Sequence, residues 1–215
     1  MIQVKDFLDL SHTAAREYLC GCETVFDFIP KIKDTVKSLT PTLGEDFYEI
    51  APEVFAAKDA EISHLATVTG PAIIGRGTVI RPGAYIRGCV IIGDGCVIGN
   101  STEIKNAVIF DGVQLPHYNY VGDSILGYKV HLGAGAIISN FRLDHKNVTV
   151  KTGKEKIETG LRKFGAVVGD FCEIGCNSVI CPGSIIMKNT LIYPLSCVRG
   201  TVGCELKKID AEENL

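Results

Sequence analysis

Two cations and a histidine interrupt a sequence that is otherwise rich in aliphatic residues and glycine. Arg87 and Lys105 are eighteen residues apart, at positions where neighbouring segments carry Gly or another small residue. If these positions stack, the two positive charges repel each other unless an anion such as a phosphate lies between them. His117 replaces an expected aliphatic residue, and an imidazole can transfer a proton near neutral pH. These residue types suit the binding and deprotonation of an anionic substrate.

A six-residue repeat positions these side chains. A branched or aromatic apolar residue recurs every six positions from Val68 to Phe110 and from Val168 to Val198, with a small or modest side chain four positions later. This period fits neither a helix nor an alternating strand, and a sandwich of short strands does not keep such a register. It is typical of a parallel β-helix, in which three hexads form one triangular coil. Sixteen clear hexads predict an all-β fold of just over five coils, with the repeated apolar residue on the axis.

The rest of the chain is organised around this repeat. Residues 1–48 show helical spacing of apolar residues, which predicts two or three short helices packed on the first coil as a cap over its exposed end. We expect residues 49–203 to form the β-helix and residues 204–215 to form a charged tail. A basic loop at residues 138–167 interrupts the repeat, and a loop of this length in a repeating scaffold usually has a function.

Composition restricts the class of protein. The chain has 215 residues, a net charge of -3, and 46% hydrophobic and 22% charged residues, as expected for a soluble protein that does not bind nucleic acid. No apolar run approaches the ~18 residues that cross a membrane, and the N-terminus does not resemble a secretion signal, so we expect a cytoplasmic protein. The nine cysteines match no familiar zinc spacing, and we expect them to be reduced, buried side chains, as at Cys96 and Cys172.

Several motifs resemble a known family. The hexads resemble those of the left-handed β-helix acyltransferases. The segments EIKN (103–106), PHYNYVGDSILG (116–127) and HLGAGAIISNF (131–141) resemble the acetyltransferase domain of the bifunctional glucosamine-1-phosphate N-acetyltransferase/N-acetylglucosamine-1-phosphate uridylyltransferase enzymes. The segment ETGLRKFGAVVGDFCEIG (158–175) is similar to archaeal-type sugar-1-phosphate nucleotidylyltransferase/acetyltransferases. The resemblance covers about 68–203, and it implies a left-handed coil and a homotrimer with active sites between subunits.

The resemblance also implies roles for individual residues on the acceptor side. His117 matches the catalytic base, and Asn140 matches a residue that contacts the amino sugar near its reacting nitrogen. The residues that match sugar-phosphate binders are Lys105, Tyr120 and one arginine, which is Arg87 by its spacing or Arg81 by its Arg-Pro-Gly motif.

The donor implied by the resemblance is acetyl-CoA, and no metal is expected. Ala134 matches a position whose backbone lies beside the acetyl thioester, and Cys176 and Pro194 align with coenzyme A contacts. In the basic loop, Arg162 and Lys163 are expected to reach a neighbouring subunit or the coenzyme's phosphates.

Three departures distinguish this sequence from the family, and the changes at His131 and Phe141 concern the acceptor. His131 replaces an Asn that helps bind the sugar phosphate, Phe141 replaces a Tyr, and the large uridylyltransferase domain has no counterpart, so uridylyl transfer is not expected. We predict an acetyl-CoA-dependent N-acetyltransferase that acts on a small amino-sugar phosphate resembling glucosamine-1-phosphate, as in UDP-N-acetylglucosamine biosynthesis. A separate nucleotidyltransferase is then a candidate partner.

Three alternatives remain open. The chain could be an acyltransferase that uses another acceptor, or a non-catalytic β-helix that binds a sugar phosphate without coenzyme A. It could also be a metalloenzyme, because zinc carbonic anhydrases share the trimeric β-helix. For that last class His117, His131 and His145 are evenly spaced, but the expected His pair five residues apart is missing.

Overall fold

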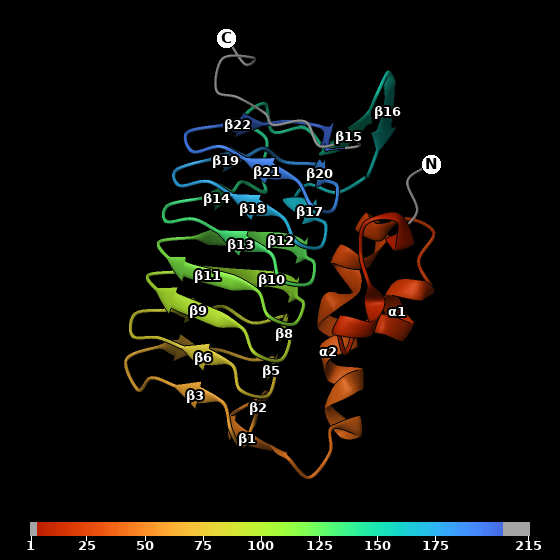
Figure 1. The fold of residues 1–215 in the computed structure, drawn as a ribbon. Helices are drawn as coiled ribbons and strands as arrows, with labels where there is room; N and C mark the ends of the chain where they lie inside the picture. The colour runs from red at the N-terminus through yellow and green to blue at the C-terminus, as the bar shows by residue number, and fades with distance from the viewer. Residues whose placement is uncertain (1–3, 204–215) are drawn as a thin grey trace.

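The computed structural model describes residues 4–203, which form a stack of short strands flanked by a group of helices (Figure 1). The predicted tail at 204–215 lies outside the described residues. The helices precede all the strands in the chain. They are η1 (Val4–Asp6), η2 (Leu10–His12), α1 (Arg16–Cys20), η3 (Val25–Lys31), α2 (Ile32–Leu39) and η4 (Thr40–Thr42), where η marks a 3-10 helix.

The strands form the three faces of a triangular prism that winds as a left-handed parallel β-helix, as predicted (Figure 1). Face one is a seven-stranded parallel sheet. Its strands are β3 (Glu61–Ile62), β6 (Val79–Ile80), β9 (Val97–Asn100), β11 (Gln114–His117), β13 (His131–Leu132), β18 (Glu173–Ile174) and β21 (Leu191–Ile192).

Two strands pass from face two to face three without interruption, and they join these faces into one sheet. These strands are β10 (Glu103–Ile109) and β12 (Tyr120–Leu126). Face two also contains β4 (Thr67–Val68), β7 (Tyr85–Ile86), β14 (Ile137–Ile138), β19 (Val179–Ile180) and β22 (Cys197–Val198). Face three also contains β2 (Val54–Ala57), β5 (Ala72–Ile74), β8 (Val90–Ile92), β17 (Ala166–Val168), β20 (Ser184–Ile186) and β23 (Thr201–Val202).

Two further pairs of strands lie outside the parallel ladders. The strand β1 (Phe47–Ala51) pairs antiparallel with β2 at the start of the prism. Within the insertion, β15 (Thr149–Thr152) and β16 (Glu155–Glu158) form an antiparallel hairpin. The last helix ends at Thr42 and β1 begins at Phe47, so the division of the chain at residue 48 stays a prediction.

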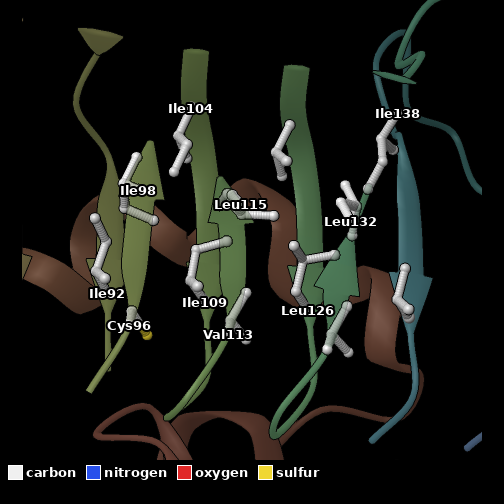
Figure 2. Close-up of a cluster of buried hydrophobic side chains, with 14 of the residues drawn as sticks. Ile92, Cys96, Ile98, Ile104, Ile109, Val113, Leu115, Leu126, Leu132 and Ile138 are labelled. Atoms are coloured by element: carbon white, nitrogen blue, oxygen red, sulfur yellow. The ribbon is translucent and has the colours of Figure 1, made fainter. Parts of the chain in front are cut away.

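Aliphatic side chains stack along the axis, as the hexads predict (Figure 2). Ile80 pairs with Ile98 and Ile86 with Ile104, eighteen residues on in each case. The spacing then shortens, because Ile92 pairs with Ile109 across seventeen residues. The strand β10 therefore crosses its corner with one residue fewer than a hexad.

This shortened coil corrects two details of the sequence analysis. The axial residue is Ile109, whereas Phe110 was predicted on the axis and instead packs outside the prism against the helices. The prism has seven coils on face one, whereas just over five were predicted. The coil number was underestimated because the irregular segments around residues 50–67 and 110–125 also form parts of coils, although they do not follow a strict period of six.

The N-terminal helices cover face three along much of its length, and not the end of the first coil as predicted (Figure 1). Strands of face three carry consecutive apolar residues, so that Ile74 points to the axis while Ile73 points outward. A strand that is apolar on both sides needs a cover on its outer side. Helix residues such as Phe28 and Ile29 supply this cover, and the outward residues that they join in one cluster are Ile73, Ile91, Val108, Ile125, Val167 and Ile185.

The insertion is partly anchored to the same layer. Val148, Val150 and Phe164 are buried in the cluster formed by the helices and face three. The rings of Phe26 and Phe164 lie 5.9 Å apart. Both ends of the insertion are therefore tied to the prism. Across residues 4–203, none of the helices combines the length and the apolar character needed to span a membrane.

The contact between the helices and face three generates a stability prediction. Phe28 is fully buried, and replacing it by Ala leaves a cavity between the two layers. We expect Phe28→Ala to lower the free energy of unfolding by about 3–5 kcal/mol, measured by chemical denaturation. Tyr48→Ala, at a half-exposed ring on β1, is the control and should change it little. Equal losses in the two variants would contradict the packing described.

Candidate functional site

Four predicted site residues lie one above another at the corner between faces one and two, the first corner. His117, Ala134, Cys176 and Pro194 occupy equivalent positions of successive coils, and we call them the first-corner column. Backbone hydrogen bonds connect the successive coils at this corner. Gly135 N donates to His117 O at 3.1 Å, Asn177 N to Ala134 O at 3.0 Å, and Leu195 N to Cys176 O at 2.9 Å.

His117 ends β11 with an exposed side chain. Its imidazole makes no hydrogen bond or ion pair with any residue in the described range 4–203. The next residue, Tyr118, turns the corner with a φ of 52°, in the left-handed region. The imidazole is therefore free to contact a ligand.

Asn119 holds this turn in place, and the sequence analysis assigned it no role. Its buried Nδ2 donates to the carbonyl of Gly133 at 2.8 Å and to that of Ala136 at 3.2 Å. Its Oδ1 accepts from the backbone N–H of His117 at 3.3 Å. A buried amide that binds the next coil thus fixes the backbone that carries the imidazole. The only signal in the sequence was an Asn immediately after a turn residue.

A second group of predicted residues meets at the corner between faces two and three, the second corner. Its centre is the Asp123 carboxylate, which is only 5% exposed. Lys105 Nζ lies 3.4 Å from both carboxylate oxygens, Asn106 Nδ2 donates at 2.8 Å, and Asn140 Nδ2 donates at 2.5 Å. The same Asn140 nitrogen lies 3.2 Å from the Tyr120 hydroxyl. We call Lys105, Asn106, Tyr120, Asp123 and Asn140 the Asp123 cluster.

Burial affects the ionisation of this cluster. It raises the pKa of Tyr120, and the negative charges of Asp123 and Glu103 add to the effect. The phenol therefore stays protonated, so that its hydroxyl can donate a hydrogen bond.

Arg87 lies on the second corner one coil before Lys105, as its spacing predicts. The guanidinium contacts Glu103 at 2.7 Å, and Lys105 is paired with Asp123. The expectation that a bound anion must separate these cations is therefore wrong for the isolated chain, because carboxylates already do so. Arg81 lies instead on the first corner, two coils before His117, which distinguishes it from Arg87.

The two corners are separated by the width of face two. His117 precedes Gly122, the residue that pairs with Lys105, by five residues. At ~3.3 Å per residue this backbone path is at most about 16 Å long, and it includes the turn at Tyr118. Within residues 4–203, no hydrogen bond or ion pair joins the His117 imidazole to the Asp123 cluster.

The remaining predicted residues have other surroundings. His131 lies on face one, where Nδ1 contacts Glu173 Oε2 of the next coil at 2.7 Å. At the base of the insertion, Arg162 donates to the carbonyl of His145 and its guanidinium lies 5.6 Å from the Phe141 ring centroid. Lys163 pairs with Phe141 in a single antiparallel bridge. Arg162 thus joins two parts of the insertion to each other.

A groove of about 690 Å³ lies on face two beneath the insertion. Cations in its lining are Arg142, Lys151 and Arg199, of which Arg142 is paired with Asp144. Arg162 and Lys163, the cations of this loop that were predicted to reach a neighbouring subunit or the coenzyme's phosphates, are not part of this lining. Asn177 and Leu195 also line the groove, so it opens onto the first corner.

Within residues 4–203, no three His, Cys, Asp or Glu side chains are grouped as metal ligands. The evenly spaced His117, His131 and His145 therefore do not converge.

Comparison with known proteins shows which proteins this chain resembles. A model of the GMPPB C-terminal domain matches residues 68–161. The bifunctional sugar-1-phosphate nucleotidylyltransferase/acetyltransferase of Sulfurisphaera tokodaii is 40% identical over 159 residues, which are 74% of this chain and 40% of that protein. The bifunctional protein GlmU of Methanococcus maripaludis is 38% identical over 158 residues, covering 65% of this chain and 38% of GlmU. This chain is therefore similar, over most of its length, to sugar-1-phosphate nucleotidylyltransferase/acetyltransferases.

The resemblance predicted from the sequence is thus confirmed. The chain spans about 40% of the length of the two curated relatives. Among solved structures, the acetyltransferase domain of PglB from Neisseria gonorrhoeae, in complex with acetyl coenzyme A, matches with a TM-score of 0.35 and 16% identity. That match covers 80% of this chain and 59% of the other, and it is too distant to carry a structural argument.

The cysteines of this chain differ in exposure, which corrects the expectation that they are buried. Cys96 and Cys172 are buried, and burial raises the pKa of each thiol to about 12. Cys20 and Cys176 are exposed, and all the described cysteines are free thiols.

This difference predicts a labelling pattern. The thiolate is the nucleophile in alkylation, so a raised pKa and burial both slow the reaction. At pH 8 we expect iodoacetamide to modify Cys20 and Cys176 while Cys96 and Cys172 stay unmodified, as read by peptide mass spectrometry. In urea all four should react, which serves as the control. Early modification of Cys96 in the folded protein would be inconsistent with the axial packing.

Proposed function

We propose that this chain is an acetyl-CoA-dependent N-acetyltransferase that acts on a small amino-sugar phosphate resembling glucosamine-1-phosphate. The observation that carries the proposal is the first-corner column. An exposed, unpartnered imidazole lies one coil below Ala134 and two coils below the exposed thiol of Cys176. An extended thioester lying along this corner would have its carbonyl beside a base.

The chemistry requires one proton to move. The acceptor amine attacks the thioester carbonyl, and His117 takes the proton that the nitrogen loses. The protonated imidazole then gives that proton to the departing coenzyme A thiolate as the carbon–sulfur bond breaks. The N–H of Ala134 makes no backbone hydrogen bond within residues 4–203, so it is available to stabilise the oxyanion.

The acceptor site is proposed to lie between subunits of a homotrimer. His117 and the Asp123 cluster belong to different corners, so the second corner of a neighbouring subunit is the source of the missing groups. Face two supports this contact, because it and the first corner expose apolar side chains that a second copy would cover. These are Tyr85, Tyr118, Val179 and Leu195.

On the acceptor side, Lys105, Tyr120 and Arg87 are proposed to orient the sugar phosphate, and Asn140 the reacting nitrogen. Acetyl-CoA is proposed to occupy the face-two groove, with its phosphates near the groove cations Lys151 and Arg199. The product would be a substrate for a nucleotidyltransferase, which we propose as a separate partner in the synthesis of a UDP-activated sugar.

One observation favours a second candidate, an acyltransferase with a different acceptor. Arg87 and Lys105 are each neutralised by a carboxylate, which weakens the attraction for a phosphate. Thiol release from acetyl-CoA, measured with amino sugars and with their 1-phosphates, separates the two candidates. Faster release with the phosphorylated acceptors supports the first.

The catalytic role of His117 predicts a large kinetic effect. His117→Ala should lower the rate of thiol release by about 10²–10⁴-fold, because it removes the general base. His64→Ala is the matched control, since this exposed histidine lies on the same corner three coils earlier. Undiminished transfer by His117→Ala would eliminate the proposed mechanism.

The shared site can be tested with the same variant. His117→Ala and Lys105→Ala subunits, co-expressed with different tags, should form mixed trimers that regain activity. In a cyclic trimer with two subunits of one kind, about one site in three combines both intact groups. Mixed trimers without activity would place both groups in one subunit and contradict the proposed assembly.

The donor site predicts selective protection. Acetyl-CoA bound along the first corner should slow the alkylation of Cys176 and leave that of Cys20, on the N-terminal helices, unchanged. The measurement is the ratio of the two labelling rates with and without acetyl-CoA. Equal rates with saturating acetyl-CoA would show that the donor binds elsewhere.

A further inference from the structure

The Asp123 carboxylate connects residues that the sequence analysis assigned to separate roles. It contacts Lys105, Asn106 and Asn140, each from a different position around the second corner. The motif GDS follows Tyr120 in the chain, yet neither the sequence analysis nor the proposed mechanism gives this carboxylate a task.

An ionised carboxylate can only accept hydrogen bonds, and this property fixes the orientation of its neighbours. The side chain of Asn140 must turn its nitrogen toward Asp123 Oδ2, and the same nitrogen reaches the Tyr120 hydroxyl. The amide oxygen of Asn140 is then directed away from the carboxylate. Within residues 4–203, every fully buried side-chain oxygen or nitrogen has a hydrogen-bond partner. The Asn140 amide oxygen has none in that range, because only the amide nitrogen is bonded. The amide oxygen is therefore not fully buried and is accessible.

We infer that Asp123 is a positioning residue that orients the Asn140 amide to accept a hydrogen bond from the acceptor's amine. The Asn140 carbonyl oxygen would accept a hydrogen bond from one N–H of the acceptor's amine. The lone pair of that amine nitrogen then points away from Asn140. The carboxylate also contacts the Lys105 ammonium at 3.4 Å. The inference rests on the proposed function, because it assumes an amine acceptor.

The backbone makes a clean test available. Asp123 has a φ of 50°, in the left-handed region, where Asp and Asn are both tolerated. Asp123→Asn therefore keeps the size and the backbone conformation but introduces an NH₂ group. An amide can donate as well as accept, so it no longer dictates which way Asn140 faces.

A second buried aspartate supplies the matched control. Asp170 accepts backbone N–H groups from Asp9 at 2.6 Å and Tyr128 at 2.7 Å, and so helps dock the N-terminal segment. It is as buried as Asp123 but contacts no residue of the proposed site. Asp170→Asn should lower thermal stability without changing the kinetics.

The experiment compares the full-length variants in the thiol-release assay with glucosamine-1-phosphate. In Asp123→Asn we expect the KM for the acceptor to rise about 10–100-fold, while the KM for acetyl-CoA stays within about twofold. Because Asp123 acts through Asn140, the same change made in an Asn140→Ala background should have a much smaller effect. Equal changes in the acceptor KM in both backgrounds would overturn the inference. So would a rise in the acceptor KM that accompanies a loss of thermal stability in Asp170→Asn as well as in Asp123→Asn.

A spectroscopic readout separates this inference from the proposed function. The side-chain NH₂ of Asn140, assigned by NMR, should show slowed hydrogen exchange that is lost in Asp123→Asn and kept in Asp170→Asn. If the wild-type protein acetylates no amino sugar, the proposed function fails while this measurement still decides whether Asp123 orients Asn140. Unchanged exchange in Asp123→Asn would refute the orientation itself.

Discussion

Backbone hydrogen bonding between successive coils is the constraint on which the site depends. Each strand of the three prism faces is paired in parallel with its equivalent in the next coil, so that corner residues far apart in sequence are held one coil spacing apart. The axial aliphatic side chains hold this register, because a slip of one residue would move them out of the core (Figure 2). Side chains at one corner thus form a fixed column, and a column of this kind can follow an extended ligand. The first-corner column and the Asp123 cluster are two such columns on one scaffold.

The sequence was sufficient to predict the fold class, because a six-residue period has few other structural solutions. The family resemblance also selected His117, Ala134, Cys176 and Pro194, and the structure places these four residues at equivalent positions of one corner. The sequence did not predict where the phase changes. Phe110 is apolar and keeps the period of six, but the uninterrupted strand β10 makes Ile109 the axial residue. A one-residue shortening of a coil leaves no clear mark when two adjacent residues are both large and apolar.

Other features depended on contacts that a repeat pattern does not encode. The helices were expected at the end of the first coil, but the outward apolar residues of face three, such as Ile91 and Ile125, required a cover along its length. Asn119 and Asp123 were missed because their importance comes from hydrogen bonds to the next coil or across a corner, and not from their own type or spacing. The carboxylate partners of Arg87 and Lys105 were missed for the same reason, although Glu103 and Asp123 were visible in the sequence.

The occupation of face three by the chain's own helices has a consequence for larger assemblies. A bare triangular prism offers three equivalent flanks, and strands that are apolar on their outer side invite indiscriminate self-association. Here one flank is already sealed by residues 4–42, so any copy of the chain must approach through the two that remain (Figure 1). The N-terminal segment thereby makes the three flanks unequal and limits the faces through which copies of the chain can associate.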